Sequence, residues 1–450
     1  MLRKITLILL VLFVTQARGA EPAKVHAHQL ENGLKVLVQV DSRSPIVVQQ
    51  VWYKVGSSYE TDGITGISHV LEHMMFKGTA RFKPGEFSEI IARNGGRENA
   101  FTGRDYTAYF QTVAKDRLPL VMEMEADRMQ GLQLDEKEFM REIQVVIEER
   151  RSRTDDKPRS KLFEQFAATA FLTDPKRNPI IGWRADIEAL TLNDLQAWYQ
   201  KWYAPNNATL VVVGDVDPQT VFQLAQKYYG PLKSMPVGQL KPRPEIPQKG
   251  TRRLRLEIEA KLPYLLMGVK VPTVFDAVES WEPYALAVLA AVLDGGESAR
   301  FADRLVRGQQ IANQAGAGYD MFDRGTGLFL FDGTPTSGQT VQAVEEALLE
   351  QIALVQKEGV GEAELEKVKT NVVASDVYER DSVFYQAMKL GRLETVGLSY
   401  NTLDDYIDKI RAVTADQVQA VAKKYFLSEN LTVAVLEPLE ADPDKEQEKK

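Results

Sequence analysis

The sequence predicts an α+β fold made of two like halves, each with helices that cover a sheet. The first observation is strand-like alternation in residues 30–40 and 46–55, and an Asn32-Gly33 turn opens the earlier stretch. The second is helical periodicity around residues 64–77, 118–129 and 136–151, with strand-like residues 99–112 between the first two blocks. Helices laid on a sheet around an apolar core define the α+β class.

The third observation is an internal repeat. Residues 191–212 align with residues 414–435 without a gap, and both copies show a capped helix, a short turn and an apolar strand. Segments of this kind can resemble each other through shared sequence preferences alone, but the repeat favours two halves of like fold, each closing with this unit. The identical pairs are Thr191/Thr414, Gln196/Gln419, Ala197/Ala420, Lys201/Lys424, Asn207/Asn430 and Thr209/Thr432.

The domain boundaries follow from length and proline content. At 450 residues the chain is long enough for roughly two to four domains. A proline-rich stretch, residues 231–247, interrupts the periodic pattern. We therefore predict an N-terminal domain of residues 21–232, a linker of residues 233–250, a C-terminal domain of residues 251–440 and a solvated charged tail of residues 441–450.

Residues 1–20 have the layout of a cleaved secretory signal peptide. Arg3 and Lys4 precede an apolar run, and small residues follow, with cleavage expected after Gly19 or Ala20. The run is shorter than the roughly 20 residues that a spanning helix needs, and no later segment is long enough. An uncleaved N-terminal anchor is the alternative. We expect an exported, periplasmic protein with no membrane span in the mature chain.

Composition excludes several functions. The formal net charge of −8 offers no electrostatic footprint for nucleic acid or for an anionic membrane surface. The chain has no cysteine, so disulfides, thiolate nucleophiles and thiolate metal ligands are excluded. Any protein-bound metal must be held by histidine and carboxylate side chains.

Two of the four histidines stand four residues apart, in the stretch His69-Val70-Leu71-Glu72-His73. On a helix, positions i and i+4 share a face, so both imidazoles can converge on one ion. Glu72 points to the same side and can act as general base on an attacking water. Two incidental surface histidines are the alternative. The order His-x-x-Glu-His is the inverted form of a common zinc-peptidase motif, which favours a zinc site.

A catalytic zinc needs a third protein ligand. His26 and His28 alternate on an expected strand and are interpreted as exposed, so a carboxylate is the default. In the helix of residues 136–151, Glu142 and Glu149 lie along the apolar stripe, seven residues apart. We interpret Glu149 as the ligand and Glu142 as a carboxylate that steadies Glu149 or a ligating imidazole. Solvated glutamates at the margin of the stripe are the alternative.

These motifs closely resemble the pitrilysin-like zinc metallopeptidases, the group that includes insulin-degrading enzyme and the mitochondrial processing peptidase. The resemblance rests on HVLEHMMFKGT, EIQVVIEE and GGRENAFTGRDYTAYF and covers essentially the whole mature chain. It implies two homologous α+β halves enclosing a peptide-binding cleft, with one zinc ion on the N-terminal half. It also places Glu149, and not Glu148, at the third-ligand position and Glu142 at the position of a second glutamate.

The same resemblance implies an edge strand that takes up an extended peptide substrate. Main-chain hydrogen bonds of this kind do not depend on side chains, which suits an enzyme for many peptides. An ordinary strand is the alternative on local pattern alone. The predicted substrate-binding residues are Asn99, Ala100, Phe101 and Thr102.

The sequence departs from the family pattern in its C-terminal half. Many members carry an Arg and a Tyr, seven residues apart, that polarise the substrate carbonyl. In this chain those positions fall on Val306 and Asn313, and Arg307 and Tyr319 are out of register. Val306 has no donor and Asn313 is an uncharged one. The chain therefore resembles the zinc-bearing member of family pairs in which a homologous partner chain supplies the Arg and the Tyr.

Together these features predict a zinc-dependent endopeptidase of peptides or unfolded segments, with Glu72 as the base and zinc polarising the scissile carbonyl. The chain is expected to be the zinc-bearing subunit of a heterodimer. The alternative is a non-catalytic peptide-binding or scaffold subunit of the same fold. The presence of His69, Glu72, His73 and Glu149 argues against that alternative.

Overall fold

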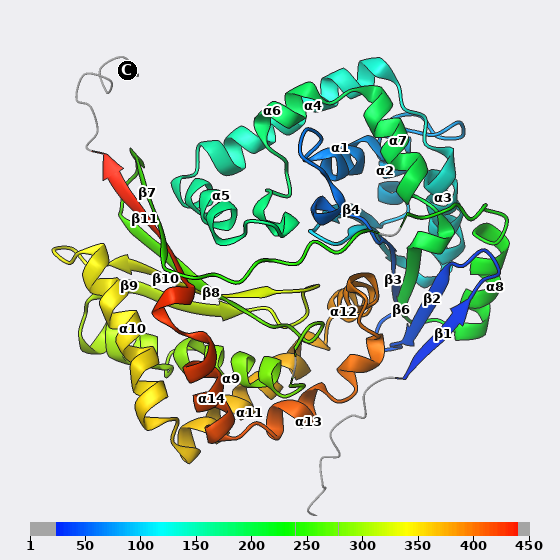
Figure 1. The fold of residues 1–450 in the computed structure, drawn as a ribbon. Helices are drawn as coiled ribbons and strands as arrows, with labels where there is room; N and C mark the ends of the chain where they lie inside the picture. The colour runs from blue at the N-terminus through cyan, green and yellow to red at the C-terminus, as the bar shows by residue number, and fades with distance from the viewer. Residues whose placement is uncertain (1–23, 239, 278, 440–450) are drawn as a thin grey trace, which may run out of the picture.

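A computed structural model describes residues 24–238, 240–277 and 279–439. The chain forms two sheets with helices packed around each, and the two halves lie side by side (Figure 1). The predicted signal peptide, residues 1–20, and the predicted tail, residues 441–450, lie outside the described residues.

The N-terminal half contains a six-stranded sheet in the order β1-β2-β6-β3-β5-β4. Its strands are β1 (Val25–Gln29), β2 (Lys35–Val40), β3 (Ile46–Tyr53), β4 (Arg97–Thr102), β5 (Thr107–Ala114) and β6 (Ala208–Gly214). Its helices are α1 (Ile67–Met74), α2 (Glu86–Arg93), α3 (Leu118–Gly131), α4 (Glu136–Arg150), α5 (Pro158–Ala170), α6 (Arg184–Ala189), α7 (Leu192–Trp202) and α8 (Pro218–Tyr228). The first two strands form an antiparallel hairpin, and the Asn32-Gly33 turn noted in the sequence lies between them.

The C-terminal half contains a five-stranded sheet in the order β7-β11-β8-β10-β9. Its strands are β7 (Arg252–Glu259), β8 (Tyr264–Val271), β9 (Ala312–Tyr319), β10 (Gly327–Pro335) and β11 (Leu431–Leu439). Its helices are α9 (Glu282–Asp294), α10 (Val341–Glu358), α11 (Glu362–Glu379), α12 (Val383–Val396), α13 (Tyr406–Arg411) and α14 (Ala415–Tyr425). Without β1, the first sheet has the same order of parallel and antiparallel neighbours as the second.

The repeat detected in the sequence is confirmed as one structural unit used twice. Thr191 and Thr414 each begin a helix, α7 and α14, with a capping box, in which the threonine hydroxyl binds a main-chain N–H of the first turn. A short 3-10 turn then leads into the central strand, β6 or β11. The unit closes the C-terminal half only, because α8 follows β6 in the N-terminal half.

Each half contributes one helix that packs on the sheet of the other half (Figure 1). Helix α5 of the N-terminal half packs on β7, β8 and β11 of the second sheet, and α12 of the C-terminal half packs on β3 and β6 of the first. In the latter contact Ala387 and Leu390 of α12 join a buried cluster with Trp52. Each sheet is therefore covered on one face by a helix from the other half, which ties the halves together through two apolar interfaces.

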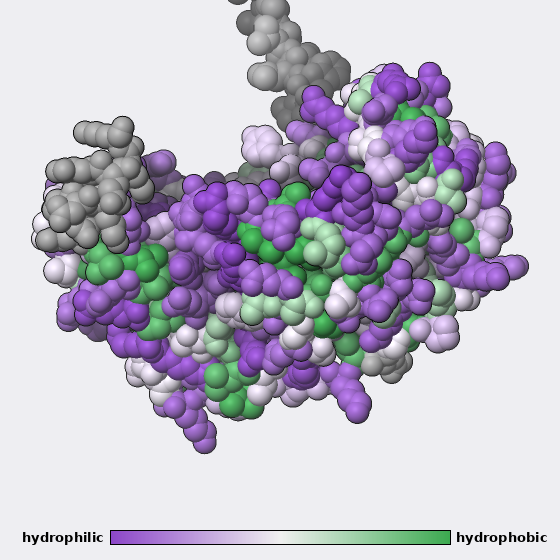
Figure 2. Space-filling model, turned by 90° about the horizontal axis from the view of Figure 1, so that it is seen from above, coloured by the Kyte–Doolittle hydropathy of each residue, from purple (hydrophilic) through white to green (hydrophobic). Residues whose placement is uncertain are grey.

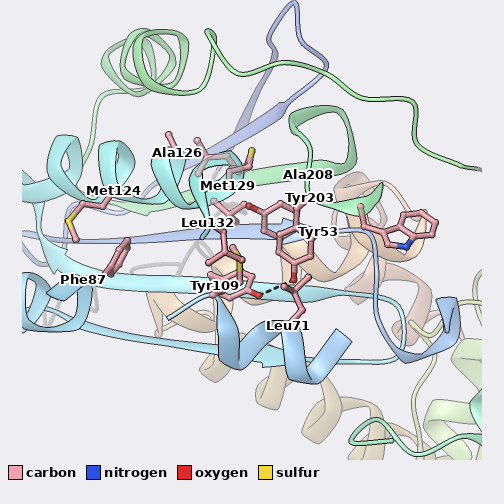
Figure 3. Packing of buried hydrophobic residues seen from close by; sticks show 14 of the residues in the cluster. Tyr53, Leu71, Phe87, Tyr109, Met124, Ala126, Met129, Leu132, Tyr203 and Ala208 are labelled. Carbon is pink, nitrogen blue, oxygen red and sulfur yellow. Dashed lines mark hydrogen bonds between the residues drawn. The ribbon is translucent and has the colours of Figure 1, made fainter. Parts of the chain in front are cut away.

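The largest core of the N-terminal half supports α1. Figure 3 shows Leu71 of this helix beside Tyr53, Tyr109 and Tyr203, and the last two share a hydrogen bond of 2.9 Å. These side chains are fully or almost fully buried. The apolar face of α1 is thus fixed to the sheet, and its other face is free to present polar side chains.

Helix α1 is shorter than the helix predicted for residues 64–77. It begins after Gly66, whose φ of 88° is left-handed and suits glycine, and it ends at Met74 before it reaches Gly78. Residues 231–238 and 240–251 form neither helix nor strand. In this segment the Glu245 carboxylate accepts hydrogen bonds from the amides of Thr173 (2.9 Å) and Asp174 (3.1 Å) and pairs with Lys270 of β8 at 2.8 Å. The segment is therefore bound to both halves.

Hydrophilic side chains cover most of the face seen in Figure 2, with hydrophobic side chains gathered near its centre. Among the described residues, no helix is both long and apolar enough to cross a membrane.

Candidate active site

A buried carboxylate holds the start of α1. Glu60 is fully buried and accepts hydrogen bonds from the main-chain N–H of Gly66 at 2.7 Å and of Ser68 at 2.9 Å. These N–H groups have no partner inside the helix, so an acceptor at this end stabilises it. Burial raises the pKa of Glu60 to about 7, against these hydrogen bonds, which lower it. Sequence analysis missed Glu60, because a contact from six residues upstream depends on the path of the turn.

His69, His73 and Glu149 converge between α1 and α4. Glu149 Oε2 lies 3.2 Å from His73 Nε2 and 3.8 Å from His69 Nε2. One ligand atom from each of the three side chains lies within 4.8 Å of the others. The neighbouring Glu148 instead pairs with Arg151 on the exposed side of α4. The side chains of these two adjacent glutamates therefore point in different directions, and only that of Glu149 faces the histidines.

Glu142 contacts this group through His73. Its Oε1 is 2.9 Å from His73 Nδ1, and its Oε2 is 2.5 Å from Lys77 Nζ. A carboxylate on Nδ1 holds the imidazole so that Nε2 is presented to the other side, toward Glu149. His69 has no such partner among the described residues, and its Nδ1 is buried without a hydrogen bond.

Glu72 lies on the same helix and is bound by the edge strand. The Thr102 hydroxyl donates a hydrogen bond of 2.5 Å to Glu72 Oε2. Burial raises the pKa of Glu72, although this hydrogen bond opposes the shift. A higher pKa makes a carboxylate a better proton acceptor near neutral pH.

The surroundings shift the pKa values of the two histidines in opposite directions. Burial and the neighbouring His73 lower the pKa of His69. Burial also acts to lower the pKa of His73, but hydrogen bonds to Glu142 and Glu149 outweigh it and raise that pKa to about 9. The hydrogen bond from His73 lowers the pKa of Glu149, which keeps this carboxylate ionised. The Glu149 carboxylate and the His73 ring thus stabilise each other.

The group of donors fits a zinc ion. Two imidazole nitrogens and one carboxylate oxygen are the ligand types of a catalytic zinc, which takes three protein ligands and leaves one position open. Glu149 also contacts Arg153 of the π-helical turn η3 (Arg151–Asp155), at 2.5 Å from Oε1, so Oε2 is left to face the histidines. Arg153 is a further residue that sequence analysis missed.

These side chains open onto a cavity of 780 Å³. All of its lining comes from the N-terminal half, including the four residues predicted to bind substrate. Strand β4 is the last strand of its sheet, and four of its residues line the cavity. The lining residues are His69, Glu72, His73, Asn99, Ala100, Phe101, Thr102, Arg104, Glu149, Arg153, Thr154, Ser160, Phe163, Glu164, Ala167, Asn178, Pro179, Ile180 and Ile181.

The C-terminal half has a cavity of 560 Å³ at the equivalent place, between β9, α9 and α11. Helix α9 occupies the position of α1 in the topology, and it lines this cavity with Ala287, Ala290 and Ala291 instead of histidines. The described residues contain one group of three His, Cys, Asp or Glu side chains close enough to hold a metal, and that group is in the N-terminal half. The two halves therefore share a fold but differ in the side chains that line their equivalent cavities.

The positions expected for a carbonyl-polarising pair lie away from the N-terminal cavity. Val306 is in the π-helical segment η6 (Phe301–Gly308), and Asn313 of β9 donates a hydrogen bond to the carbonyl of Pro335. Arg307 is paired with Glu297 and Asp303. Tyr319 donates to the carbonyl of Pro272 at 2.5 Å. None of these four residues lines the cavity beside His69.

Comparison with known proteins agrees with two related but unequal halves. Residues 35–183 match the family described as Insulinase (Peptidase family M16), and residues 189–372 match Peptidase M16 inactive domain. Zinc protease PqqE of Helicobacter pylori is 34% identical over 421 residues, 91% of this chain and 92% of that protein. A crystal structure of a protease from Helicobacter pylori has a TM-score of 0.87 at 31% identity, over 93% of this chain and 100% of that chain.

The periplasmic protease PqqL from Escherichia coli has the same fold, with a TM-score of 0.78 at 18% identity. The likeness covers 95% of this chain and 50% of that one. Two like α+β halves, of which the first holds the one group of side chains among the described residues that could bind a metal, agree with the match to M16-type peptidases. Because this chain is 34% identical to a zinc protease over 91% of its own length, and because residues 35–183 match the M16 family, it belongs to peptidase family M16.

Proposed function

We propose that this protein is a zinc-dependent endopeptidase that hydrolyses peptides or unfolded protein segments. The observation that carries the proposal is the convergence of His69, His73 and Glu149 within 4.8 Å, beside Glu72 and an edge strand. His69, His73 and Glu149 would hold one zinc ion per chain, with Glu142 orienting His73. The bound ion would polarise the scissile carbonyl and make an attacking water more acidic.

The remaining chemistry belongs to side chains of this protein. Glu72 takes the proton of the attacking water and passes it to the leaving amine, and its raised pKa suits both steps. The Thr102 hydroxyl fixes one oxygen of Glu72, which leaves the other oxygen for the water. Since Thr102 is also the last residue of β4, the base and the substrate-binding strand are held in one geometry.

Peptide binding by strand addition follows from the place of β4 at the sheet edge. Asn99, Ala100, Phe101 and Thr102 line the cavity beside the metal-ligating group. An extended peptide on this edge would form main-chain hydrogen bonds, and its scissile bond would lie beside Glu72. Such binding requires an unfolded segment, because a folded substrate has no free strand edge to offer.

A homologous partner chain is the proposed source of the missing Arg and Tyr. Two observations support this source. The cavity is lined by residues of the N-terminal half, and Arg307 and Tyr319 contact Glu297 and Pro272 instead of lining it. The twofold length of the periplasmic protease PqqL relative to the matched segment is consistent with two such units acting together. Export to the periplasm rests on the signal-like residues 1–20.

The alternative is a non-catalytic peptide-binding subunit, which the match of residues 189–372 to an inactive domain keeps open. The test is cleavage of unstructured peptides by the zinc-loaded protein, alone and with its homologous partner, before and after chelation. Glu72→Gln should keep zinc and lose about 10²–10⁴-fold in turnover, because an amide cannot accept the proton. If Glu72→Gln cleaves as fast as the wild-type protein, Glu72 is not the base. If no peptide is cleaved with the partner present, the binding subunit is favoured.

A further inference from the structure

The loop between β9 and β10, residues 320–326, belongs to the C-terminal half but contacts residues that lie next to two walls of the N-terminal cavity. On one side Arg324 Nε donates a hydrogen bond to Asp105 Oδ1 at 2.8 Å, and Arg324 Nη2 forms an ion pair with the same oxygen at 2.6 Å. On the other side Lys176 Nζ donates to the main-chain carbonyl of Thr326 at 2.6 Å. One loop therefore joins both walls.

The first wall is the turn between β4 and β5. Asp105 lies in this turn, directly after the cavity residue Arg104, and is only 4% exposed. The amide of Ser58 donates to the Arg104 carbonyl at 2.7 Å. The guanidinium of Arg324 also stands over the Tyr59 ring, 4.9 Å from its centre. The turn is held between the short helix η1 (Ser57–Tyr59) and the loop of the other half.

The second wall follows the short helix η4 (Pro175–Arg177), which contains Lys176. This lysine is 3% exposed, so its ammonium group needs an acceptor, and the Thr326 carbonyl provides one. The next residues along the chain, Asn178 to Ile181, line the cavity. A shift of the loop would therefore move this wall as well.

The loop is itself anchored to α12. Arg392 of this helix pairs with Asp320 and, at 2.9 Å, with Asp323. Because α12 packs on β3 and β6 of the first sheet, the anchor is tied to the half that carries the metal-ligating group. The loop thus has a fixed position from which it can hold the turn and the wall.

We infer that Arg324 is a positioning residue for peptide hydrolysis, which acts by holding the β4–β5 turn and, through it, the substrate-binding edge of β4. The inference rests on the proposed function. It gives the C-terminal half a role in catalysis without any contact with the reacting atoms. Removing one partner of a buried ion pair leaves the other charge uncompensated, so Asp105 would move toward water and take the turn with it.

The first experiment measures Arg324→Gln for peptide cleavage, zinc content and thermal stability. The expected result is a fall in kcat/KM of about 10- to 100-fold, mostly through KM, because a displacement of about 1 Å in a positioning element has effects of this size. Zinc per chain should be unchanged, since Arg324 does not contact His69, His73 or Glu149. Arg324→Lys should restore part of the loss, and so should the double variant with Asp105→Asn, which removes the uncompensated charge.

The matched control is Lys35→Gln, which breaks another ion pair between the halves, Lys35 with Glu394 at 2.7 Å, away from the cavity. It should leave KM unchanged. Hydrogen exchange of residues 97–106 gives a reading that needs no turnover, and Arg324→Gln alone should make it faster. The inference is overturned if Arg324→Gln changes neither KM nor exchange, or if Lys35→Gln has the same effects. Faster exchange in a protein that cleaves no peptide would support the positioning role and sink the proposed function.

Discussion

Replacing Glu149 with Gln should remove zinc from the protein, whereas replacing its neighbour Glu148 should not. Glu149 Oε2 is 3.2 Å from His73 Nε2, and its side chain is 14% exposed. Glu148 is 61% exposed and paired with Arg151. The two variants make the same chemical change one residue apart, so a difference in zinc content reports only on the direction in which each carboxylate points.

The size of the effect follows from the ligand count. Loss of a residue that only supports a ligand costs about 10–100-fold in metal affinity, and loss of a ligand should exceed that range. We therefore expect the zinc Kd to rise more than about 100-fold in Glu149→Gln, which is about 2.7 kcal/mol or more. Glu142→Gln should fall within the range of about 10–100-fold, because Glu142 contacts His73 Nδ1 and would support this ligand without being one itself.

The assay is elemental analysis after dialysis, followed by competition with a chelator of known zinc affinity. Thermal stability of each variant without metal serves as the folding control. Equal zinc per chain in Glu149→Gln and Glu148→Gln would refute the assignment of Glu149. A zinc loss in Glu142→Gln as large as that in Glu149→Gln would show that both carboxylates are ligands.

Three further predictions concern packing, pH and the partner. Gly391→Ala should lower the free energy of unfolding by about 1–3 kcal/mol in chemical denaturation, because its Cβ would lie 2.1 Å from Trp52 Nε1, whereas Gly318→Ala, with open space around it, should not. Burial acts to raise the pKa of Glu245, but the Lys270 hydrogen bond and the amides of Thr173 and Asp174 outweigh it and lower that pKa to about 2. Its carboxylate therefore stabilises the fold above pH of about 4.5 and loses this effect as pH falls toward 2. The difference in unfolding free energy between wild type and Glu245→Gln, about 2 kcal/mol after a discount for solvent screening, should shrink below pH of about 4, and a pH series of thermal melts should show the Tm difference shrinking with it. The chain alone should cleave peptides about 10²–10³-fold more slowly per zinc than with its homologous partner, and equal rates would contradict the proposed division of roles.

Local periodicity was enough to predict which of the candidate site residues share one face of a helix. The spacing of His69 and His73 places them on one face of a helix, and the seven-residue spacing of Glu142 and Glu149 keeps both on one side of α4. The structure places Glu149 on both imidazoles and Glu142 on His73 alone. The repeat at residues 191–212 and 414–435 likewise predicted the capped helix and central strand of each half.

Features that depend on contacts distant in sequence could not be predicted in this way. Glu60 supports α1 only because the intervening turn folds back, and nothing in its local pattern distinguishes it from a solvated glutamate. The exchange of α5 and α12 between the halves also has no local signal. An amphipathic helix pattern shows that one face is buried, but not which sheet buries it.

The exchange of helices has a consequence for how a peptide can reach the site. Trp52 of β3 packs against Ala387 and Leu390 of α12, and Phe166 of α5 packs against Leu266 and Ala434 of the second sheet, so opening the halves would expose two apolar interfaces. The segment held by Glu245 adds charged and main-chain contacts to both halves. Movement of one half against the other is therefore costly, so the cavity beside His69 keeps the lining that the N-terminal half gives it. Under the proposed function, an extended peptide would therefore have to enter this cavity without separation of the two sheets, and any partner chain would have to bind without opening them.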